Sequence, residues 1–275
     1  MGQQNGIGRI RAAFRQAQGA GRAALMPYYT LGYPDRESSL AIVEAIAPYS
    51  DLIELGVPFS DPLADGPTIQ HSTQRSLEAG TTVVGCLEMV RTLRSRGVTT
   101  PFMMMGYYNP VLAYGQDAYA ADMAAAGADG FIIPDLPVEE AEELGRLARD
   151  AGLALIHFLA PTSNPQRVAS VVERAQGFIY MVSLTGITDS AAGPASGLPE
   201  LVAAVREQAS VPVAVGFGIK TPAQAAAVGA YADGVIVGSA LIRAVESAAE
   251  RAAMPETAAA FVRALREGLE EPAAA

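Results

Sequence analysis

Eight short apolar runs recur along this chain, and a segment with helical periodicity follows each of them. The runs are 24–31, 52–56, 102–107, 130–133, 153–158, 178–182, 212–215 and 234–237. Their spacing of roughly 27 residues lies within the spread expected of a (β/α)8 barrel. Parallel strands buried on both faces read as continuous apolar runs. The sequence therefore predicts an α/β fold, a single (β/α)8 TIM barrel.

Helical segments fill the intervals between these runs. We expect helices at 8–19, 36–48, 68–78, 83–96, 117–126, 139–151, 165–174, 199–208, 222–229, 239–250 and 256–268. The first of them precedes the first strand, so the barrel carries an extra N-terminal helix. The length of 275 residues fits one such domain. We predict a single domain over 1–275, with 270–275 as a disordered tail.

The strand–helix unit is also internally similar. Residues 127–133 and 232–237 both pass from a helix end through Asp-Gly into a strand, and 49–53 is a looser copy. The competing architecture is an open doubly wound sheet. A glycine fingerprint normally follows the first strand of such a sheet, whereas here the first strand leads into Thr30-Leu-Gly-Tyr-Pro34.

Composition excludes several classes of protein. The net charge of −10, with no run of Lys or Arg, argues against binding to nucleic acid. The uncharged stretch 101–116 is too short and too interrupted by Pro and Gly to span a membrane. The N-terminus has no signal pattern, so we expect a cytoplasmic protein. One cysteine, Cys86, and two histidines, His71 and His157, provide no ligand set for a metal.

The stretch 51–70 places a glutamate inside an apolar strand and two aspartates on the loop after it. Side-chain alternation puts Glu54 on the same face as Leu52, toward the mouth of the barrel. Burial there is expected to raise the pKa of Glu54 toward that of a proton donor. Asp65 should lie closer to water and stay ionised, while Asp61 holds the loop or faces a partner. The structural alternative is an edge-strand Glu followed by two turn-forming Asp residues.

Glycines follow the last two strands, as Gly216-Phe-Gly218 and Gly238-Ser239. Backbone N–H groups at such positions, next to a helix N-terminus, bind anions. Barrels of this type often bind phosphate there. The alternative is that both are simply tight turns. After the sixth strand, 183–197 is long, small and polar, as in a lid, and Tyr180 just before it can place a phenol in the mouth.

Five motifs, in one order along nearly the whole chain, resemble the tryptophan synthase α subunit family. They are Tyr29–Pro34, Glu54–Gln70, Met105–Pro110, Pro134–Glu140 and Gly216–Ile219. The resemblance implies retro-aldol cleavage of indole-3-glycerol phosphate to indole and glyceraldehyde 3-phosphate. It also implies that this chain has no cofactor, and that pyridoxal phosphate belongs to a β subunit with which it forms an α2β2 complex.

The resemblance further assigns roles to single residues. Glu54, Asp65 and Tyr180 match the catalytic positions. Glu54 handles the protons at indole C3 and at the substrate hydroxyl, and Asp65 accepts from the indole N–H. The substrate-binding positions are Tyr28, Thr30, Ile69, Met105, Ile132, Thr188, Gly216, Gly218, Gly238 and Ser239. Of these, Tyr28, Ile69, Met105 and Ile132 enclose the indole, and Gly218, Gly238 and Ser239 bind the phosphate.

The loop after the sixth strand departs from the family pattern. Asp189 stands where the family usually has a glycine that contacts phosphate, and an acid there disfavours an anion, while Thr188 is kept. The partner surface implied by the family is the Asp61 loop together with the loops after strands three and six, including the apolar segment 107–111. Two alternatives stay open: a stand-alone indole-glycerol phosphate lyase, and a catalytically impaired subunit that binds and activates the β partner.

Overall fold

The computed structural model describes residues 5–182, 197–216 and 218–270 of the chain. Its eight strands are all parallel and close into a barrel, because β1 pairs with β8 and every other strand with its neighbours in sequence. They are β1 (Ala24–Thr30), β2 (Ile53–Gly56), β3 (Phe102–Met105), β4 (Gly130–Ile132), β5 (Ala154–Leu159), β6 (Ile179–Val182), β7 (Val213–Gly216) and β8 (Gly234–Val237). The predicted barrel is confirmed, and the open sheet is excluded.

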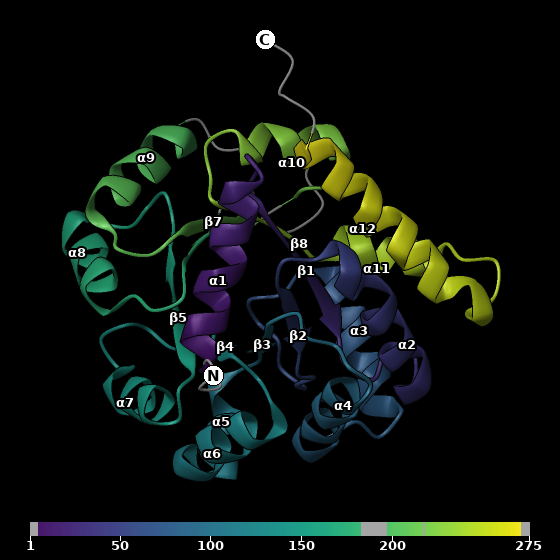
Figure 1. Cartoon of the computed structure of the whole chain (residues 1–275). Helices are drawn as coiled ribbons and strands as arrows, with labels where there is room; N and C mark the ends of the chain where they lie inside the picture. Colours follow the sequence, from purple (N-terminus) through teal and green to yellow (C-terminus); the bar gives the residue numbers. More distant parts are fainter. Residues whose placement is uncertain (1–4, 183–196, 217, 271–275) are drawn as a thin grey trace.

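Helices surround the barrel as an outer ring, apart from α1, which lies across one end of it (Figure 1). They are α1 (Gly6–Gly19), α2 (Arg36–Ile46), α3 (Pro67–Glu78), α4 (Val83–Ser95), α5 (Tyr108–Tyr114), α6 (Gln116–Ala126), α7 (Glu142–Asp150), α8 (Pro165–Arg174), α9 (Leu198–Gln208), α10 (Pro222–Gly229), α11 (Ser239–Glu246) and α12 (Met254–Glu270), with 3-10 turns η1 (Ala47–Tyr49) and η2 (Arg251–Ala253). None of the helices in the described ranges has the length and apolar character needed to cross a bilayer.

The predicted N-terminal helix closes one end of the barrel. The side chain of Asn5 caps α1 by accepting a hydrogen bond from the backbone N–H of Gly8 (3.0 Å). Ile10 and Phe14 lie on the buried face of α1, and the ring of Phe14 packs 5.7 Å from that of Phe178 inside the barrel. In Figure 1, α1 crosses the centre of the barrel. The opposite end, at the carboxyl ends of the strands, is not covered by this helix.

The alternation predicted for β2 is present. Ile53 and Leu55 pack in the core between the barrel and the helices, whereas Leu52 belongs to the separate core inside the barrel. Glu54 lies between Ile53 and Leu55 on the strand, so its side chain points to the inside. The register pairs Glu54 with Tyr28 on β1 and with Met103 on β3.

Three aspartates at the N-terminal end of the barrel join neighbouring strands, and we call them the Asp clamps. Each precedes a strand and accepts a hydrogen bond from a backbone N–H near the start of the strand before it: Asp51 from Leu25 (2.8 Å), Asp129 from Phe102 (2.8 Å) and Asp233 from Val213 (2.9 Å). Each also pairs with an arginine that precedes that earlier strand: Asp51 with Arg22 (2.6 Å), Asp129 with Arg94 (2.8 Å) and Asp233 with Arg206 (2.8 Å). The three clamp aspartates lie in the similar segments 49–53, 127–133 and 232–237, so their shared contacts account for the repeat in the sequence.

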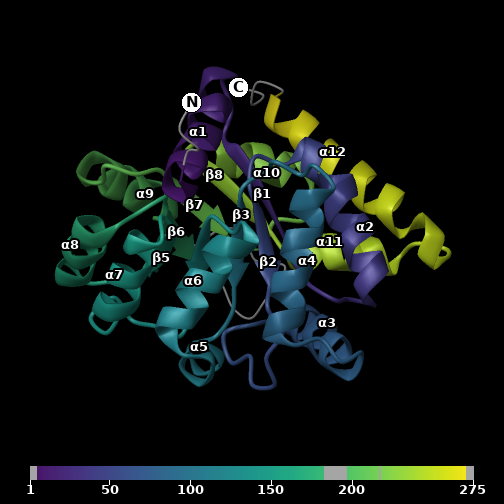
Figure 2. The same ribbon diagram turned by 60° about the horizontal axis from the view of Figure 1, so that its bottom comes forward.

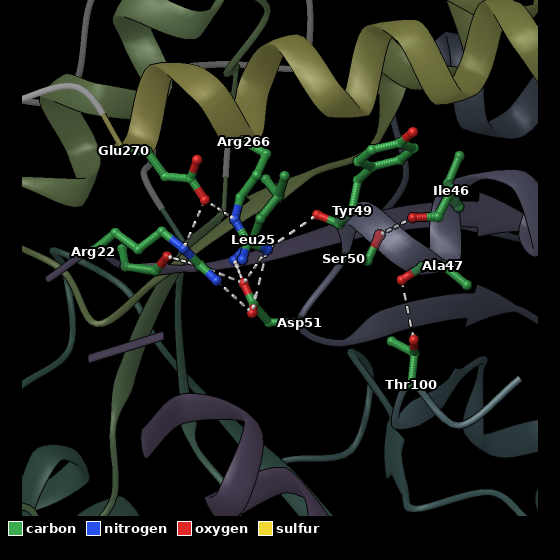
Figure 3. A network of polar contacts seen from close by, with 11 residues as sticks. Arg22, Leu25, Ile46, Ala47, Tyr49, Ser50, Asp51, Thr100, Arg266 and Glu270 are labelled. Carbon is green, nitrogen blue, oxygen red and sulfur yellow. Dashed lines mark hydrogen bonds and ion pairs between the residues drawn. The ribbon is translucent and has the colours of Figure 1, made fainter. Parts of the chain in front are cut away.

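The first clamp also holds the C-terminal helix (Figure 3). Arg22 donates two hydrogen bonds to Asp51, at 2.6 and 2.9 Å. Arg266 of α12 approaches the same carboxylate at 3.4 Å and pairs with Glu270 at 2.7 Å. The last turns of α12 are thus held by a polar network that also contains Arg22, just before β1. It runs to Glu270, and the remaining part of the predicted tail, 271–275, lies outside the described residues.

Three differences from the predicted helices are large, whereas the other helix boundaries agree within two residues. The segment 107–111, expected as a loop, contains the start of α5. Pro110 is its third residue, a position whose N–H makes no intrahelical bond, so proline is tolerated there. Helix α7 begins at Glu142 and not at 139, because turns from Pro137 and Val138 come first. Helix α11 ends at Glu246, four residues before the predicted end.

Candidate active site

A cavity of about 500 Å³ opens at the carboxyl ends of the strands. In Figure 2, α1 lies at the top of the molecule, and the loop after β2 lies at the bottom beside α3 and α5, so the two ends of the barrel are distinct. The cavity is lined by Tyr28, Glu54, Ala64, Asp65, Gly66, Ile69, Met105, Pro134, Phe158, Tyr180, Val182, Gly216, Gly218, Ile219, Lys220, Ile236, Gly238, Ser239, Ala240 and Arg243. Most of the predicted site residues are therefore brought together.

Glu54 supplies the most unusual group in the cavity. The residue is 1% exposed, and neither carboxyl oxygen has a hydrogen-bond partner among the described residues. Burial raises the pKa of Glu54 to about 8, because a buried carboxylate loses its hydration. At neutral pH the group is mainly protonated. Glu54 can therefore donate a proton to a bound molecule and then act as a base.

Asp65 lies on the loop between β2 and α3 and is half-buried. Burial raises the pKa of Asp65 to about 6, although a hydrogen bond from Tyr107 acts in the opposite direction. The expectation that Asp65 is ionised at neutral pH is consistent with this pKa. Asp65 is also closer to water than Glu54, as expected, although it is buried enough for its pKa to rise. The two acids thus differ in charge at neutral pH.

Tyr107 holds the Asp65 loop in place. Its hydroxyl donates to the Asp65 carboxylate (3.0 Å) and accepts from the backbone N–H of Ala64 (3.0 Å). The ring of Phe59 packs 5.4 Å from that of Tyr107. From the other side, the amide of Gln70 donates to the backbone oxygen of Asp65 (2.8 Å). The carboxylate is therefore positioned by a residue that follows β3, 42 positions away in the sequence.

The phenol rings of two tyrosines line the cavity, and each packs closely against a glycine. A Cβ on Gly56 would come within 2.1 Å of the Tyr28 hydroxyl, and one on Gly216 within 2.5 Å of the Tyr180 hydroxyl. Only glycine leaves room for these rings. Burial raises the pKa of both tyrosines well above the ordinary value. Tyr28 and Tyr180 therefore remain neutral and can donate or accept hydrogen bonds without adding charge.

Two predicted binding residues do not line the cavity. Thr30 is fully buried, and its hydroxyl contacts the hydroxyls of Tyr28 (3.2 Å) and Ser72 (2.7 Å). It supports Tyr28 from behind. Ile132 is fully buried in the inner core. At this part of the wall the lining residues are Pro134 and Phe158, neither of which was predicted from the sequence.

The wall formed by β7, β8 and the loops after them carries the predicted anion-binding positions. Gly216, Gly218, Gly238 and Ser239 all line the cavity. Ser239 begins α11 and is 8% exposed, and its hydroxyl has no hydrogen-bond partner among the described residues. A buried polar group without a partner is unfavourable, so a bound acceptor would stabilise it.

Two cationic side chains on the same wall were missed. Lys220 follows Gly218 and Ile219, and Arg243 lies in the second turn of α11. The sequence feature that could have identified Lys220 as a site residue is its position directly after the glycine loop. Arg243 could be placed only once the barrel had brought α11 next to α3, where its guanidinium donates to the Thr68 hydroxyl (3.1 Å).

Several other sequence predictions concern residues elsewhere. Thr188 and Asp189, with the predicted lid up to residue 196, lie outside the described residues. Cys86 is buried in α4, as expected of a packing residue. His157 is buried on β5, and burial lowers its pKa to about 4. Within the described ranges, no three His, Cys, Asp or Glu side chains are grouped as metal ligands.

Comparison with known proteins identifies the family. The family model "Tryptophan synthase alpha chain" matches residues 14–270. The tryptophan synthase alpha chain of Chloroflexus aurantiacus is 49% identical over 267 residues, which cover 97% of this chain and 100% of that one. That of Roseiflexus sp. is 49% identical over 261 residues, covering 94% of this chain and 100% of that one.

Solved structures agree with these relatives. Tryptophan synthase of Mycobacterium tuberculosis superposes with a TM-score of 0.87 at 40% identity, covering 96% of this chain and 98% of that one. Tryptophan synthase subunit alpha of Legionella pneumophila gives a TM-score of 0.85 at 36% identity, covering 95% and 98%. Both likenesses extend over the barrel that carries the two acids, and with the sequence matches they show that this chain belongs to the tryptophan synthase alpha chain family.

Proposed function

We propose that Glu54 and Asp65 perform the acid–base chemistry of this family in this chain. The tryptophan synthase alpha chain is the indole-3-glycerol phosphate lyase part of tryptophan synthase, and it releases indole and glyceraldehyde 3-phosphate by a retro-aldol cleavage. The observation that supports the assignment is the buried carboxyl of Glu54 with a pKa of about 8. Such a group can hold a proton at neutral pH and still accept one later.

The proposed proton transfers involve only the two acids and the substrate. Protonated Glu54 donates its proton to indole C3, and the ionised Asp65 accepts a hydrogen bond from the indole N–H, which stabilises the positive charge that develops on the ring. The resulting Glu54 carboxylate removes the proton from the glycerol hydroxyl. The electron pair of the breaking carbon–carbon bond returns to the ring, and the hydroxyl carbon becomes the aldehyde. The net change is one proton moved from the hydroxyl to C3.

The cavity walls support one orientation of the substrate. Ile69, Met105 and Phe158 give an apolar surface beside the acids, which suits an indole. We place the phosphate at Gly218, Gly238 and Ser239, on the opposite side. Tyr180 would contribute a neutral hydroxyl between the two ends. Thr30 would act by holding Tyr28, and Ile132 by packing beneath the site.

The central test is substitution of each acid in the isolated chain. We expect Glu54→Gln to lower kcat by a factor of about 100 to 10,000, the range typical of a lost general acid or base. Asp65→Asn should lower it about a hundredfold or more, because the developing charge loses its partner. Asp61→Asn is the matched control: Asp61 is exposed on the same loop, and we expect indole release within about twofold of wild type.

Near wild-type indole release by a folded Glu54→Gln or Asp65→Asn variant would contradict the assignment. The same assay, run with and without a β chain, distinguishes the alternatives. A stand-alone lyase would show no activation. An impaired subunit would bind the β chain without turnover of its own.

We further propose that this chain docks on a β subunit, with an α2β2 complex as the assembly, through the end of the barrel that carries the site. Leu63 on the Asp65 loop is 92% exposed, and Leu112 on α5 is 49% exposed. Exposed apolar side chains grouped in this way are typical of an interaction surface. Tyr107 joins the two segments, so binding there can influence Asp65 directly.

The remaining proposals concern the setting of the reaction. We propose that the whole chain works as one domain, because helices from α1 to α12 pack on one closed barrel. We propose that this chain uses no cofactor of its own, as is known for the family, and that pyridoxal phosphate belongs to the β subunit. A cytoplasmic location is proposed from membership of a family of soluble biosynthetic enzymes.

A further inference from the structure

The chain uses lysine in one place. Of its 19 lysines and arginines, only Lys220 is a lysine, and it lines the active-site cavity. It lies in the connection from β7 to α10 and is half-buried. Its backbone N–H donates to the side chain of Gln224 (2.8 Å), but among the described residues its ammonium group has no ion-pair partner.

Several exposed arginines also have no ion-pair partner among the described residues, but such isolation is unusual for a partly buried cation of this protein. The net charge is −10, and the buried Arg22 and the partly buried Arg94 each meet a carboxylate of an Asp clamp. A partly buried charge loses hydration, and without an opposite charge nothing offsets the loss. An anion that enters the cavity would supply the missing partner.

A second unsatisfied group lies on the same wall. The Ser239 hydroxyl is buried without a hydrogen-bond partner in the described part of the chain, and Ser239 lines the cavity together with Lys220. The two residues follow the adjacent strands β7 and β8. Glu54 and Asp65 come from β2 and the loop after it. The cavity therefore has an acidic side and a cationic side, as expected for a molecule that is anionic at one end.

We propose that the ammonium group of Lys220 binds the substrate's phosphate and makes the enzyme select phosphorylated substrates. This rests on the proposed function and adds a side-chain charge to the backbone N–H groups of the glycine loops. Lysine binds phosphate as a point charge, and the Ser239 hydroxyl would donate alongside it. At a half-buried site, removal of the charge should weaken phosphate binding about tenfold to a hundredfold.

The first test compares three variants. Lys220→Met removes the charge at similar length, Lys220→Arg keeps it, and Arg146→Met makes the same change in net charge at an exposed pair with Asp150. We expect Lys220→Met to raise KM for indole-3-glycerol phosphate and the inhibition constant of inorganic phosphate about tenfold to a hundredfold, with kcat within about threefold. Lys220→Arg should recover most of the affinity. Arg146→Met should leave both constants unchanged, and so should indole binding in every variant.

The second test uses the wild-type protein and does not depend on how the variants fold. An amine-acylating reagent can modify only one side-chain amine in this sequence, and modification of Lys220 is followed by mass spectrometry. Inorganic phosphate should slow acylation of Lys220, with half-protection at the same concentration that gives half-saturation in calorimetry. Acylation unaffected by saturating phosphate, or unchanged phosphate affinity in Lys220→Met, would overturn the proposal.

Direct phosphate binding separates this inference from the proposed function. If the wild-type chain binds phosphate through Lys220 but releases no indole, the assignment of the acids fails and the Lys220 site stands. If it releases indole and Lys220→Met binds phosphate as wild type does, only the Lys220 site fails.

Discussion

The buried carboxyl of Glu54 makes the folded state sensitive to pH. Its pKa is about 8 in the folded protein, against 4.5 for an ordinary glutamate. Between these values the folded state binds more protons than the unfolded state. The contribution of Glu54 to stability is therefore fully present below pH 4.5 and is lost as the pH rises through 8. A residue placed for catalysis thus reduces stability at the pH where the enzyme works.

Replacement of Glu54 by glutamine should separate activity from stability. Glu54→Gln keeps the shape and cannot ionise, so we expect an inactive protein that is more stable than wild type. The gain should grow from near zero at acidic pH to on the order of 5 kcal/mol above pH 8, at about 1.4 kcal/mol per pKa unit. Denaturant unfolding across this range measures it, with the exposed Glu207→Gln as control. A gain that does not vary with pH would show that Glu54 is not the group responsible.

The two acids also predict the pH dependence of catalysis. Cleavage requires Glu54 protonated and Asp65 ionised, and burial raises their pKa values to about 8 and about 6. We expect kcat/KM for indole-3-glycerol phosphate to follow a bell shape, falling below about pH 6 and above about pH 8. Tyr107→Phe removes the hydrogen bond that lowers the pKa of Asp65. The acidic limb of this variant's pH–rate profile should therefore move to higher pH. An unmoved limb would exclude Asp65 as the titrating group.

At the scale of elements, the Asp clamps join helices and strands at the end of the barrel away from the site. The contribution of each clamp to the free energy of unfolding should increase with the burial of its Asp side chain. These side chains are 7%, 1% and 25% exposed at Asp51, Asp129 and Asp233. Asp51→Ala leaves the buried Arg22 with only Glu270, at 3.6 Å, and Asp129→Ala leaves the partly buried Arg94 unpaired. Each change should cost about 3–5 kcal/mol. Asp233→Ala, with its more exposed Arg206, should cost about 1–2 kcal/mol.

Urea unfolding of the three clamp variants gives this order directly. Asp150→Ala serves as the control, because the Arg146–Asp150 pair is 57% and 67% exposed and should contribute less than about 0.5 kcal/mol. Equal losses at all three clamps would mean that the backbone hydrogen bonds, which the clamps share, and not the buried ion pairs determine their contribution.

The elements also show which features a sequence can predict. The strands and the inward direction of Glu54 follow from local alternation and apolar runs. Helix α5 was not predicted, and its Pro110 lies in the first turn, where a helix accepts proline. At β4 the cavity is lined two residues further along than expected, by Pro134 instead of Ile132, and β5 adds Phe158, where no lining residue was predicted. Closing a barrel staggers neighbouring strands, and that stagger is a property of the whole sheet.

At the scale of the whole molecule, closure brings together residues with no local relation. The hydrogen bond of Tyr107 to Asp65 and that of Arg243 to Thr68 join segments 42 and 175 positions apart. The hydrophobic periodicity of the sequence does not predict such pairs. The sequence motifs identified the acids and the glycine loops, because these lie on single strands and the loops after them. The residues that position them, and the cations Lys220 and Arg243 opposite, depend on packing between distant loops.

The surface around the mouth leads to a last prediction. Leu63 and Leu112 are exposed on the Asp65 loop and on α5, and Tyr107 links both segments to Asp65. The double variant Leu63→Asp/Leu112→Asp should weaken binding to a β chain at least tenfold, since two charges would be buried in an apolar interface. Indole release by the isolated chain should stay within about threefold of wild type, because neither side chain lines the cavity. Sedimentation and turnover with added β chain measure the two effects.

The matched control is Val84→Asp, because Val84 is 50% exposed, close to the 49% of Leu112, but lies on α4 and not on the Asp65 loop or α5. It should bind the β chain as wild type does. If the double variant bound equally well, the partner surface would have to lie elsewhere on the molecule. If it bound weakly and its isolated activity also collapsed, the leucines would be shaping the Asp65 loop itself. Loss of binding with intact isolated activity is the outcome expected of a docking surface that reaches the site through Tyr107.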